Sequence, residues 1–166
     1  MAEAVQVREA REGDLEGLVA IYNDVLATST AIFSHVPVTL EERTQWWRAR
    51  ASQGYPVLVA RDARGVLGYA SFGDFRAGSG YRFTVEHSVH VRLGCRGRGV
   101  GTVLLTELLA RAAALGKHVM IGGVDADNTA SIRFHERLGF EQVGRLREVG
   151  YKFERWLDLV FLQRRP

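Results

Sequence analysis

Cysteine and long apolar runs are almost absent from this chain of 166 residues. Cys95 is the only cysteine, so the sequence offers neither a disulfide framework nor a cysteine metal cluster. A chain without disulfides fits a reducing compartment. No apolar stretch approaches the roughly 20 residues that cross a bilayer, and the start of the chain lacks the apolar core of a signal peptide. We therefore expect a cytoplasmic protein with no membrane partner and no bound metal.

Lysine is also scarce, because only Lys117 and Lys152 are lysines among the 22 basic residues. The arginines are spread along the chain and the net charge is only +3, so no basic block favours nucleic acid as a partner. The length and the hydrophobic fraction of 46% suit one globular domain over residues 1–166. No repeat, linker or low-complexity segment divides the chain.

The hydrophobic periodicity predicts a mixed α/β domain. Strands are expected at 5–10, 55–62, 66–75, 83–91, 118–125 and twice within 141–164, and helices at 14–29, 40–53, 101–116 and 128–140. The expected helix caps are Asp14, Thr39 and Asn128. This order places helices on both faces of a sheet, and the unit from Phe83 to Asp125 should be a right-handed parallel crossover.

The segment "RGRGVGT", residues 96–102, joins an expected strand to an expected helix. Its glycines let backbone N–H groups approach an anion, and the helix start adds its dipole. No lysine follows Gly99 or Gly101 as in a Walker A loop, and the mid-chain spacing G-x-G-x-G differs from the dinucleotide fingerprint. Taken alone, the segment fits a pyrophosphate site and an arginine-rich turn equally well.

Spacing favours the pyrophosphate site. R-x-x-G-x-G after the strand "SVHV" resembles the acetyl-CoA loop of the GNAT superfamily of N-acetyltransferases. The segment "NTASIRFHERLGF" resembles a second motif of that superfamily, and the expected element order matches its fold over essentially the whole chain. "AIYND", "TAIF", "GYASFGDFR", "YRFTVEHSVHV" and "KFERWLDLVFLQ" resemble the branch that acetylates phosphinothricin and methionine sulfoximine. His90 departs from the tyrosine usual in that branch, and Leu93 and Gly94 depart from its acidic or polar residues.

The resemblance implies a single-domain GNAT fold with a mixed, mostly antiparallel sheet, a central parallel pair and helices on both faces. It implies an enzyme that transfers the acetyl group of acetyl-CoA directly to the α-amine of a small amino acid or analogue, such as phosphinothricin, methionine sulfoximine or methionine sulfone. The backbone of residues 89–91 is expected to pair with the pantetheine amides as an added strand would. The implied cofactor-binding residues are Val89, His90, Val91, Arg96, Gly97, Arg98, Gly99, Val100, Gly101, Thr102, Asn128 and Ser131.

Two residues are expected to act in catalysis. The resemblance places a catalytic glutamate at Glu86, where burial beside the pocket would raise the carboxyl pKa toward that of a useful base. His135 lies seven residues after Asn128, where many GNAT enzymes have a tyrosine thought to protonate the leaving thiolate. Histidine can donate a proton too, and packing at a helix–strand junction is the alternative for His135. Cys95 is interpreted as structural, since a covalent route needs an adjacent base.

Substrate-binding residues are expected upstream of the glycine loop. Arg76 and Arg82 flank a flexible connector, and guanidinium groups bind carboxylates well. A bulge in the strand could turn Thr84 or His87 toward the pocket. Phe33 is expected to form an apolar wall. Relatives of this kind are commonly dimers, so we expect a homodimer with Lys152 and Trp156 near the interface.

Three alternatives stay open at this point. The acceptor could be another amine, such as a protein N-terminus or a polyamine, although a polyamine site should be lined with acidic residues. The chain could be a non-catalytic acyl-CoA-binding module, which has no need of Glu86. A phosphate-loop nucleotide hydrolase is the third alternative, and the missing lysine disfavours it.

Overall fold

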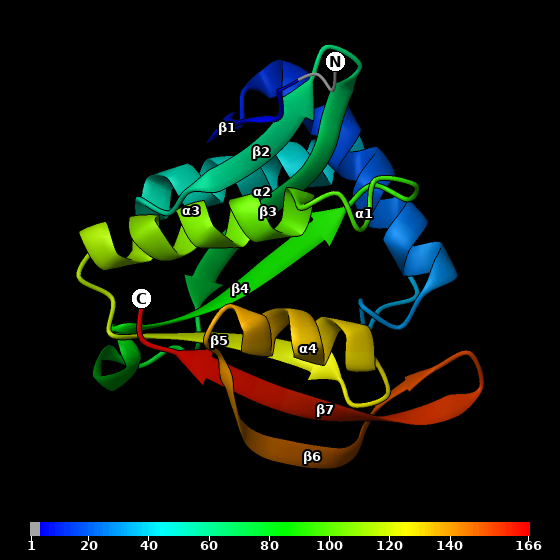
Figure 1. Cartoon of the computed structure of the whole chain (residues 1–166), viewed down its shortest axis with the longest axis vertical. Helices are drawn as coiled ribbons and strands as arrows, with labels where there is room; N and C mark the ends of the chain where they lie inside the picture. Colours follow the sequence, from blue (N-terminus) through cyan, green and yellow to red (C-terminus); the bar gives the residue numbers. More distant parts are fainter. Residues whose placement is uncertain (1–3) are drawn as a thin grey trace.

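The computed structural model describes residues 4–166, which form one seven-stranded mixed sheet with helices on both faces (Figure 1). The strand order is β1-β2-β3-β4-β5-β7-β6. The strands are β1 Gln6–Glu9, β2 Val57–Asp62, β3 Gly65–Asp74, β4 Thr84–Val91, β5 Val119–Asp125, β6 Glu141–Lys152 and β7 Arg155–Arg164. The helices are α1 Leu15–Thr28, α2 Leu40–Gln53, α3 Val100–Ala114 and α4 Thr129–Arg137, with short 3-10 turns η1 Glu12–Asp14 and η2 Ser79–Tyr81. The predicted order of elements is confirmed.

Side-chain alternation in β2 divides the core into two layers. Val57 and Val59 pack in the cluster that contains the buried face of α1, whereas Leu58 and Ala60 pack in the cluster under α3. Because successive strand residues point to opposite faces, α1 and α3 lie on opposite sides of the sheet, as Figure 1 shows. Ile132 of α4 belongs to the α3 cluster, so α3 and α4 cover the same face.

The helix starts agree with the expected caps except at Asp14. Thr39 accepts a hydrogen bond from the Glu42 backbone N–H in a capping box, and Asn128 accepts one from the Ser131 N–H. Asp14 makes no such cap to α1. Its buried carboxylate instead pairs with Arg8 at 2.7 Å, because the helix start lies against the first strand. Asp14 therefore stands at the N-cap position of α1, but its carboxylate accepts from the Arg11 backbone N–H of the preceding turn η1 rather than from α1.

The parallel pair β4–β5 is short, and this creates an opening in the sheet. The two strands pair only from Thr84–Val119 to Glu86–Ile121. Beyond Glu86, β4 stays paired with β3 through an unbroken register, while β5 stays paired with β7. The bulge considered for β4 is therefore absent from the described strand. The β5-facing edge of β4 after Glu86 is left without a strand partner.

Candidate active site

Two cavities adjoin the open edge of β4, and the larger one extends along the glycine loop. Its volume is about 620 Å³. Eleven of the twelve residues expected to bind a cofactor line it: Val89, His90, Val91, Arg96, Gly97, Gly99, Val100, Gly101, Thr102, Asn128 and Ser131. Arg98 does not line this cavity; its exposed guanidinium lies 3.9 Å from the Cys95 sulfur. The structure thus gathers residues from β4, α3 and the start of α4 around one cleft.

The glycine loop has the backbone conformation that an anion cradle requires. Gly97 and Gly99 have φ angles of +75° and +78°, a region that side-chain-bearing residues rarely adopt. Gly99 lies immediately before Val100, the first residue of α3, so the N–H groups of the first helical turn are free of helical partners. These N–H groups and the helix dipole favour a negatively charged ligand at this point.

A smaller cavity of about 280 Å³ adjoins the open edge of β4 and contains two buried histidines. His87 of β4 and His135 of α4 bring their Nε2 atoms to 3.1 Å, with their rings stacked. Burial, together with the nearby His135 and His90, lowers the pKa of His87 to about 3. Burial also lowers the pKa of His135. Both rings are therefore neutral at pH 7.

The hydrogen bonds of this pair fix its tautomers. The His135 Nδ1 lies 2.7 Å from the Ser131 carbonyl oxygen, so Nδ1 must carry the proton of the neutral ring. His135 Nε2 is then an acceptor, and His87 must donate to it from its own Nε2. The His87 Nδ1 is left as a buried acceptor without a protein partner. In this arrangement His135 has no free N–H to offer to a leaving group.

Glu86 lies on the other face of the sheet from this histidine pair. A Cβ placed on Gly123 would lie 3.7 Å from the Glu86 carboxylate, whereas one on Gly122 would lie 2.8 Å from His87 Nε2. Gly73, which pairs with Glu86, lies under the guanidinium of Arg50 from α2. Partial burial raises the pKa of the Glu86 carboxyl above its ordinary value. Glu86 thus lies at the last parallel pair before the sheet opens, on the face that α2 covers.

The expected substrate residues are not brought into one cluster. Arg76 and Arg82 are exposed in the loop before β4, where they lie over the Phe75 and Phe83 rings. Neither arginine lines the two cavities beside β4. Thr84 begins β4 at the end remote from the glycine loop. His87 does line the smaller cavity, but only as part of the histidine pair.

Phe33 lies in the segment that follows α1, close to the smaller cavity. Its neighbours Ala31 and Ile32 line that cavity, and its own ring contacts Gly150 of β6. Thr30 donates a hydrogen bond to Asp125, another residue of the cavity wall. Sequence reasoning missed Asp125, although its place at the end of β5 marked it as a residue of the open sheet edge.

Sequence reasoning also missed two arginines of α2. Arg43 is buried over the Tyr22 and Trp46 rings, and Arg50 extends over Gly73. No salt bridge to either arginine is formed within residues 4–166, and each has a buried Nε atom without a partner. Arg43, Trp46 and Arg50 recur at helical spacing, which is the signal that could have identified this shared face.

Lys152 and Trp156, expected near a partner subunit, have different environments. Lys152 is buried, with only 2% of its surface exposed, and its ammonium donates to three backbone carbonyls of its own chain. The ammonium of Lys152 is therefore fully used within its own chain, and its place near a partner subunit stays a prediction. Trp156 is 63% exposed on the β6–β7 hairpin.

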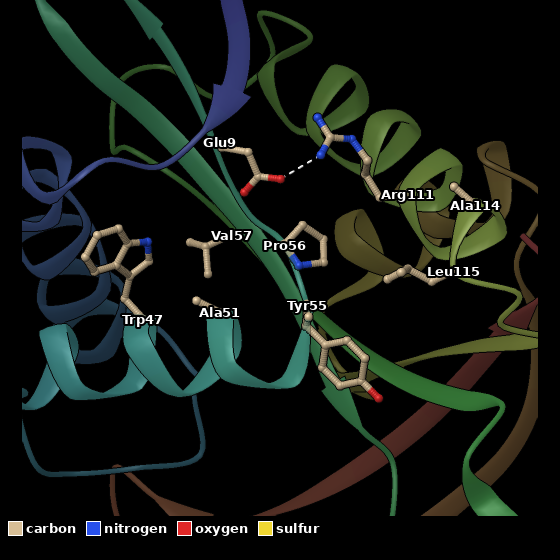
Figure 2. A pocket seen from close by; sticks show the side chains of 10 residues that line it. Glu9, Trp47, Ala51, Tyr55, Pro56, Val57, Arg111, Ala114 and Leu115 are labelled. Atoms are coloured by element: carbon tan, nitrogen blue, oxygen red, sulfur yellow. Dashed lines mark hydrogen bonds and ion pairs between the residues drawn. The ribbon is translucent and has the colours of Figure 1, made fainter.

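A further pocket of about 350 Å³ lies beside β1 and β2, between the C-terminal ends of α2 and α3 (Figure 2). Trp47, Tyr55 and Leu115 form its apolar walls. The charged groups at its rim, Glu9 and Arg111, already pair with each other at 2.6 Å. None of the expected site residues lines this pocket.

The resemblance implied a pyrophosphate loop beside a central parallel pair, and the structure has both. Residues 18–140 match the family model of the Acetyltransferase (GNAT) family. The chain therefore belongs to the GNAT family of acetyltransferases and is an enzyme of that class. The expectations of a GNAT fold and of acetyl transfer are confirmed.

Relatives with known activities are similar over nearly the whole chain. The L-methionine sulfoximine/L-methionine sulfone acetyltransferase of Pseudomonas paraeruginosa is 53% identical, covering 96% of this chain and 94% of its own. A phosphinothricin N-acetyltransferase of Alcaligenes faecalis is 42% identical, covering 97% and 82%. Among solved structures, the acetyltransferase yncA of Salmonella typhimurium with its cofactor acetyl-CoA has a TM-score of 0.95 and 44% identity, covering 98% and 94%.

Two further observations concern partners. No helix within residues 4–166 has both the length and the apolar character needed to cross a membrane. The same residues contain no group of three or more histidine, cysteine or acidic side chains placed to hold a metal ion.

Proposed function

We propose that this chain acetylates the α-amine of a small amino acid or analogue, with methionine sulfoximine, methionine sulfone and phosphinothricin as substrates, and takes the acetyl group from acetyl-CoA. The observation that carries the proposal is the opening between β4 and β5, with the glycine loop at one end and Glu86 at the other. The 53% identity to a methionine sulfoximine/sulfone acetyltransferase supports this choice of acceptor.

The residues around the larger cleft fit acetyl-CoA. The backbone of Gly97, Gly99 and the first turn of α3 would bind the pyrophosphate, and the exposed Arg96 would add a positive charge. The unpaired edge of β4 at Val89 to Val91 offers backbone groups to the pantetheine amides. This use of main-chain groups explains why His90 can replace the usual tyrosine. Asn128 and Ser131 close the cleft from the α4 side.

Glu86 is the proposed base. The acceptor ammonium must lose one proton before its nitrogen can attack the thioester carbonyl. A carboxylate with a raised pKa takes up that proton better than an ordinary one, directly or through a water. The nitrogen attacks the thioester carbonyl carbon, and the C–S bond breaks after the C–N bond has formed. The nitrogen then gives up its second proton, the thiolate takes up one proton from Glu86 or from solvent, and one proton is released to solvent overall.

For His135 we propose a role other than protonation of the thiolate. A neutral ring whose Nδ1–H and Nε2 are both engaged is a poor proton donor. We propose that the His87–His135 pair instead forms a rigid, uncharged wall beside the reacting carbon. For the acceptor carboxylate, Arg76 and Arg82 remain the proposed cations, with Phe33 as the apolar wall and Thr84 beside Arg82 at the start of β4.

Thiol release over a panel of amines tests this function. Methionine sulfoximine, methionine sulfone, phosphinothricin, a peptide with a free N-terminus and spermidine would each be supplied with acetyl-CoA. The amino-acid analogues should turn over fastest. No turnover with any of the three would refute the proposed acceptor, and preferential acetylation of the peptide or of spermidine would establish one of the alternatives. Binding of acetyl-CoA without any turnover would establish the non-catalytic alternative.

We further propose a cytoplasmic homodimer that associates through the β6–β7 hairpin. The hairpin exposes the large apolar side chains of Leu146, Val149, Tyr151, Phe153 and Trp156, an arrangement typical of an interface. A second copy of the chain is the proposed partner. Sedimentation equilibrium should show a dimer, and Trp156→Glu should shift it toward monomer. A monomeric wild type at micromolar concentration would refute the dimer.

A further inference from the structure

Lys152 holds the only buried ammonium group among the described residues. Its Nζ donates hydrogen bonds of 2.7 Å to the carbonyl oxygens of Leu26, Ser29 and Ile32. An ammonium has three donors, so all of them are used. The three acceptors belong to the last turn of α1 and to the segment that follows it.

This charge has no acidic partner. No salt bridge to Lys152 is formed within residues 4–166, and burial lowers the pKa of its ammonium. The negative end of the α1 dipole and the three carbonyl dipoles compensate the charge instead. Burying an unpaired charge lowers the stability of the folded protein. In return, one side chain of β6 fixes the positions of three backbone carbonyls, one in the last turn of α1 and two in the segment after it.

Neighbouring residues of β6 hold the same segment. Gly150 lies against the Phe33 ring so closely that a Cβ on Gly150 would be 2.6 Å from a ring carbon. The Tyr151 carbonyl oxygen lies 3.0 Å from His35 Nε2. From the other side, Thr30 is hydrogen-bonded to Asp125 at the end of β5. Residues 29–35 are therefore held in place by contacts with both β5 and β6.

Residues 29–35 also form a wall of the proposed reaction site. Ala31 and Ile32 line the cavity that contains His87, Ser88 and His135, and Ser29 and Ala31 also line the larger cleft beside the glycine loop. We propose that Lys152 is a positioning residue that fixes this wall, and that the wall sets the affinity and selectivity for the acceptor amino acid. The inference rests on the proposed function, since it assigns the smaller cavity to the acceptor; Ile32 lines that cavity and does not line the larger cleft.

Replacement of Lys152 by methionine tests the proposal directly. Lys152→Met keeps an unbranched side chain one atom shorter than lysine and removes all three hydrogen bonds. The KM for methionine sulfoximine should rise about tenfold or more. The KM for acetyl-CoA should rise less, because most residues of the larger cleft belong to β4, the glycine loop, α3 and α4. Preference among the three acceptor analogues should also narrow, because a loosened wall no longer discriminates their side chains. A general loss of folding would instead lower the apparent kcat and leave both KM values unchanged, because unfolded molecules do not contribute to turnover.

A matched pair of glycine variants reaches the same wall without removing a buried charge. Gly150→Ala forces the Phe33 ring to move, whereas Gly144 of the same strand has open space around its Cβ position. Gly150→Ala should raise the KM for methionine sulfoximine about fivefold or more, and Gly144→Ala should leave it within about twofold. If Lys152→Met does not fold, this pair decides the proposal.

The outcomes separate this inference from the proposed function. If the wild type acetylates none of the three analogues, the proposed function fails. If the wild type acetylates them but Lys152→Met and Gly150→Ala leave the acceptor KM unchanged, only the positioning role fails. A rise in the KM for acetyl-CoA alone would also overturn it, since the wall would then belong to the acetyl-CoA site.

Discussion

His87 and His135 bring their Nε2 atoms within 3.1 Å of each other, although 48 residues separate them in the chain. Because the Ser131 carbonyl accepts from His135 Nδ1, the single proton between the two rings belongs to His87. A pair arranged in this way presents hydrogen-bonded, uncharged rings to the cavity. Because both nitrogens of His135 are engaged, the pair suits a structural role better than acid catalysis.

The tautomers of this pair are the first prediction. Histidine at position 135 should be protonated at Nδ1, and histidine at position 87 at Nε2, because only this combination satisfies both contacts. Long-range proton–nitrogen NMR at pH 7 distinguishes the two ring forms. His87→Leu frees His135 Nε2 and should change the nitrogen shifts of His135. An Nε2-protonated His135 in the wild type would contradict the assignment.

Substitution of Glu86 tests the base. Glu86→Gln should lower kcat by about 10²–10⁴-fold, the usual contribution of general acid–base catalysis, and calorimetry should show acetyl-CoA binding unchanged. In the wild type, kcat/KM should rise with pH through a value above the ordinary pKa of a glutamate, because burial raises the pKa of Glu86. That rise should be missing from the residual activity of the variant. Unchanged activity in Glu86→Gln would remove Glu86 from the mechanism.

The two arginines of the glycine loop should differ in their effects. Arg96 lines the larger cleft and Arg98 does not. Arg96→Gln should therefore raise the KM for acetyl-CoA by about tenfold, the value of one charge-assisted hydrogen bond, and Arg98→Gln should raise it less. Steady-state kinetics with the acceptor at saturation measures both. An equal or larger effect at Arg98 would show that the loop rearranges when it binds its ligand.

Much of this fold follows from local patterns in the sequence. Periodicity fixed the order of strands and helices, and the spacing of Gly97, Gly99 and Gly101 located the glycine loop before α3. Both depend on residues close together in the chain, so one sequence suffices to recognise them. The predicted side-chain cap of α1 by Asp14 does not form, because Arg8 on the neighbouring strand pairs with the carboxylate.

The details of the site were harder to predict because they depend on distant contacts. Lys152 lies 126 residues from Leu26, and no local pattern in the sequence shows that its ammonium donates a hydrogen bond to the Leu26 carbonyl of α1. Likewise, the sequence placed Glu86 and His87 side by side without showing that they face opposite sides of the sheet. Resemblance to a family supplied the candidate residues, whereas only the structure separates the carboxylate from the histidine pair.

The lowered pKa values of three histidines make the stability of this protein depend on pH. Burial lowers the pKa of His87 to about 3, and burial with Arg43 and Arg96 lowers that of His90 to about 4; burial also lowers that of His135. The unfolded chain takes up these protons near pH 6.5, so the stabilisation is fully present above that pH. It is lost as the pH falls from 6.5 toward the folded-state values.

The free energy of unfolding should therefore fall between pH 7 and pH 5, with His87 alone contributing about 2 kcal/mol. Urea unfolding at the two pH values, followed by tryptophan fluorescence, measures this fall. His87→Leu removes one of the buried titrating groups and should show a smaller fall than the wild type, even though its stability at pH 7 is lower. His118 is exposed, so His118→Gln should behave as the wild type does. Equal stability of the wild type at both pH values would mean that the buried histidines take up protons as readily in the folded protein as in the unfolded chain.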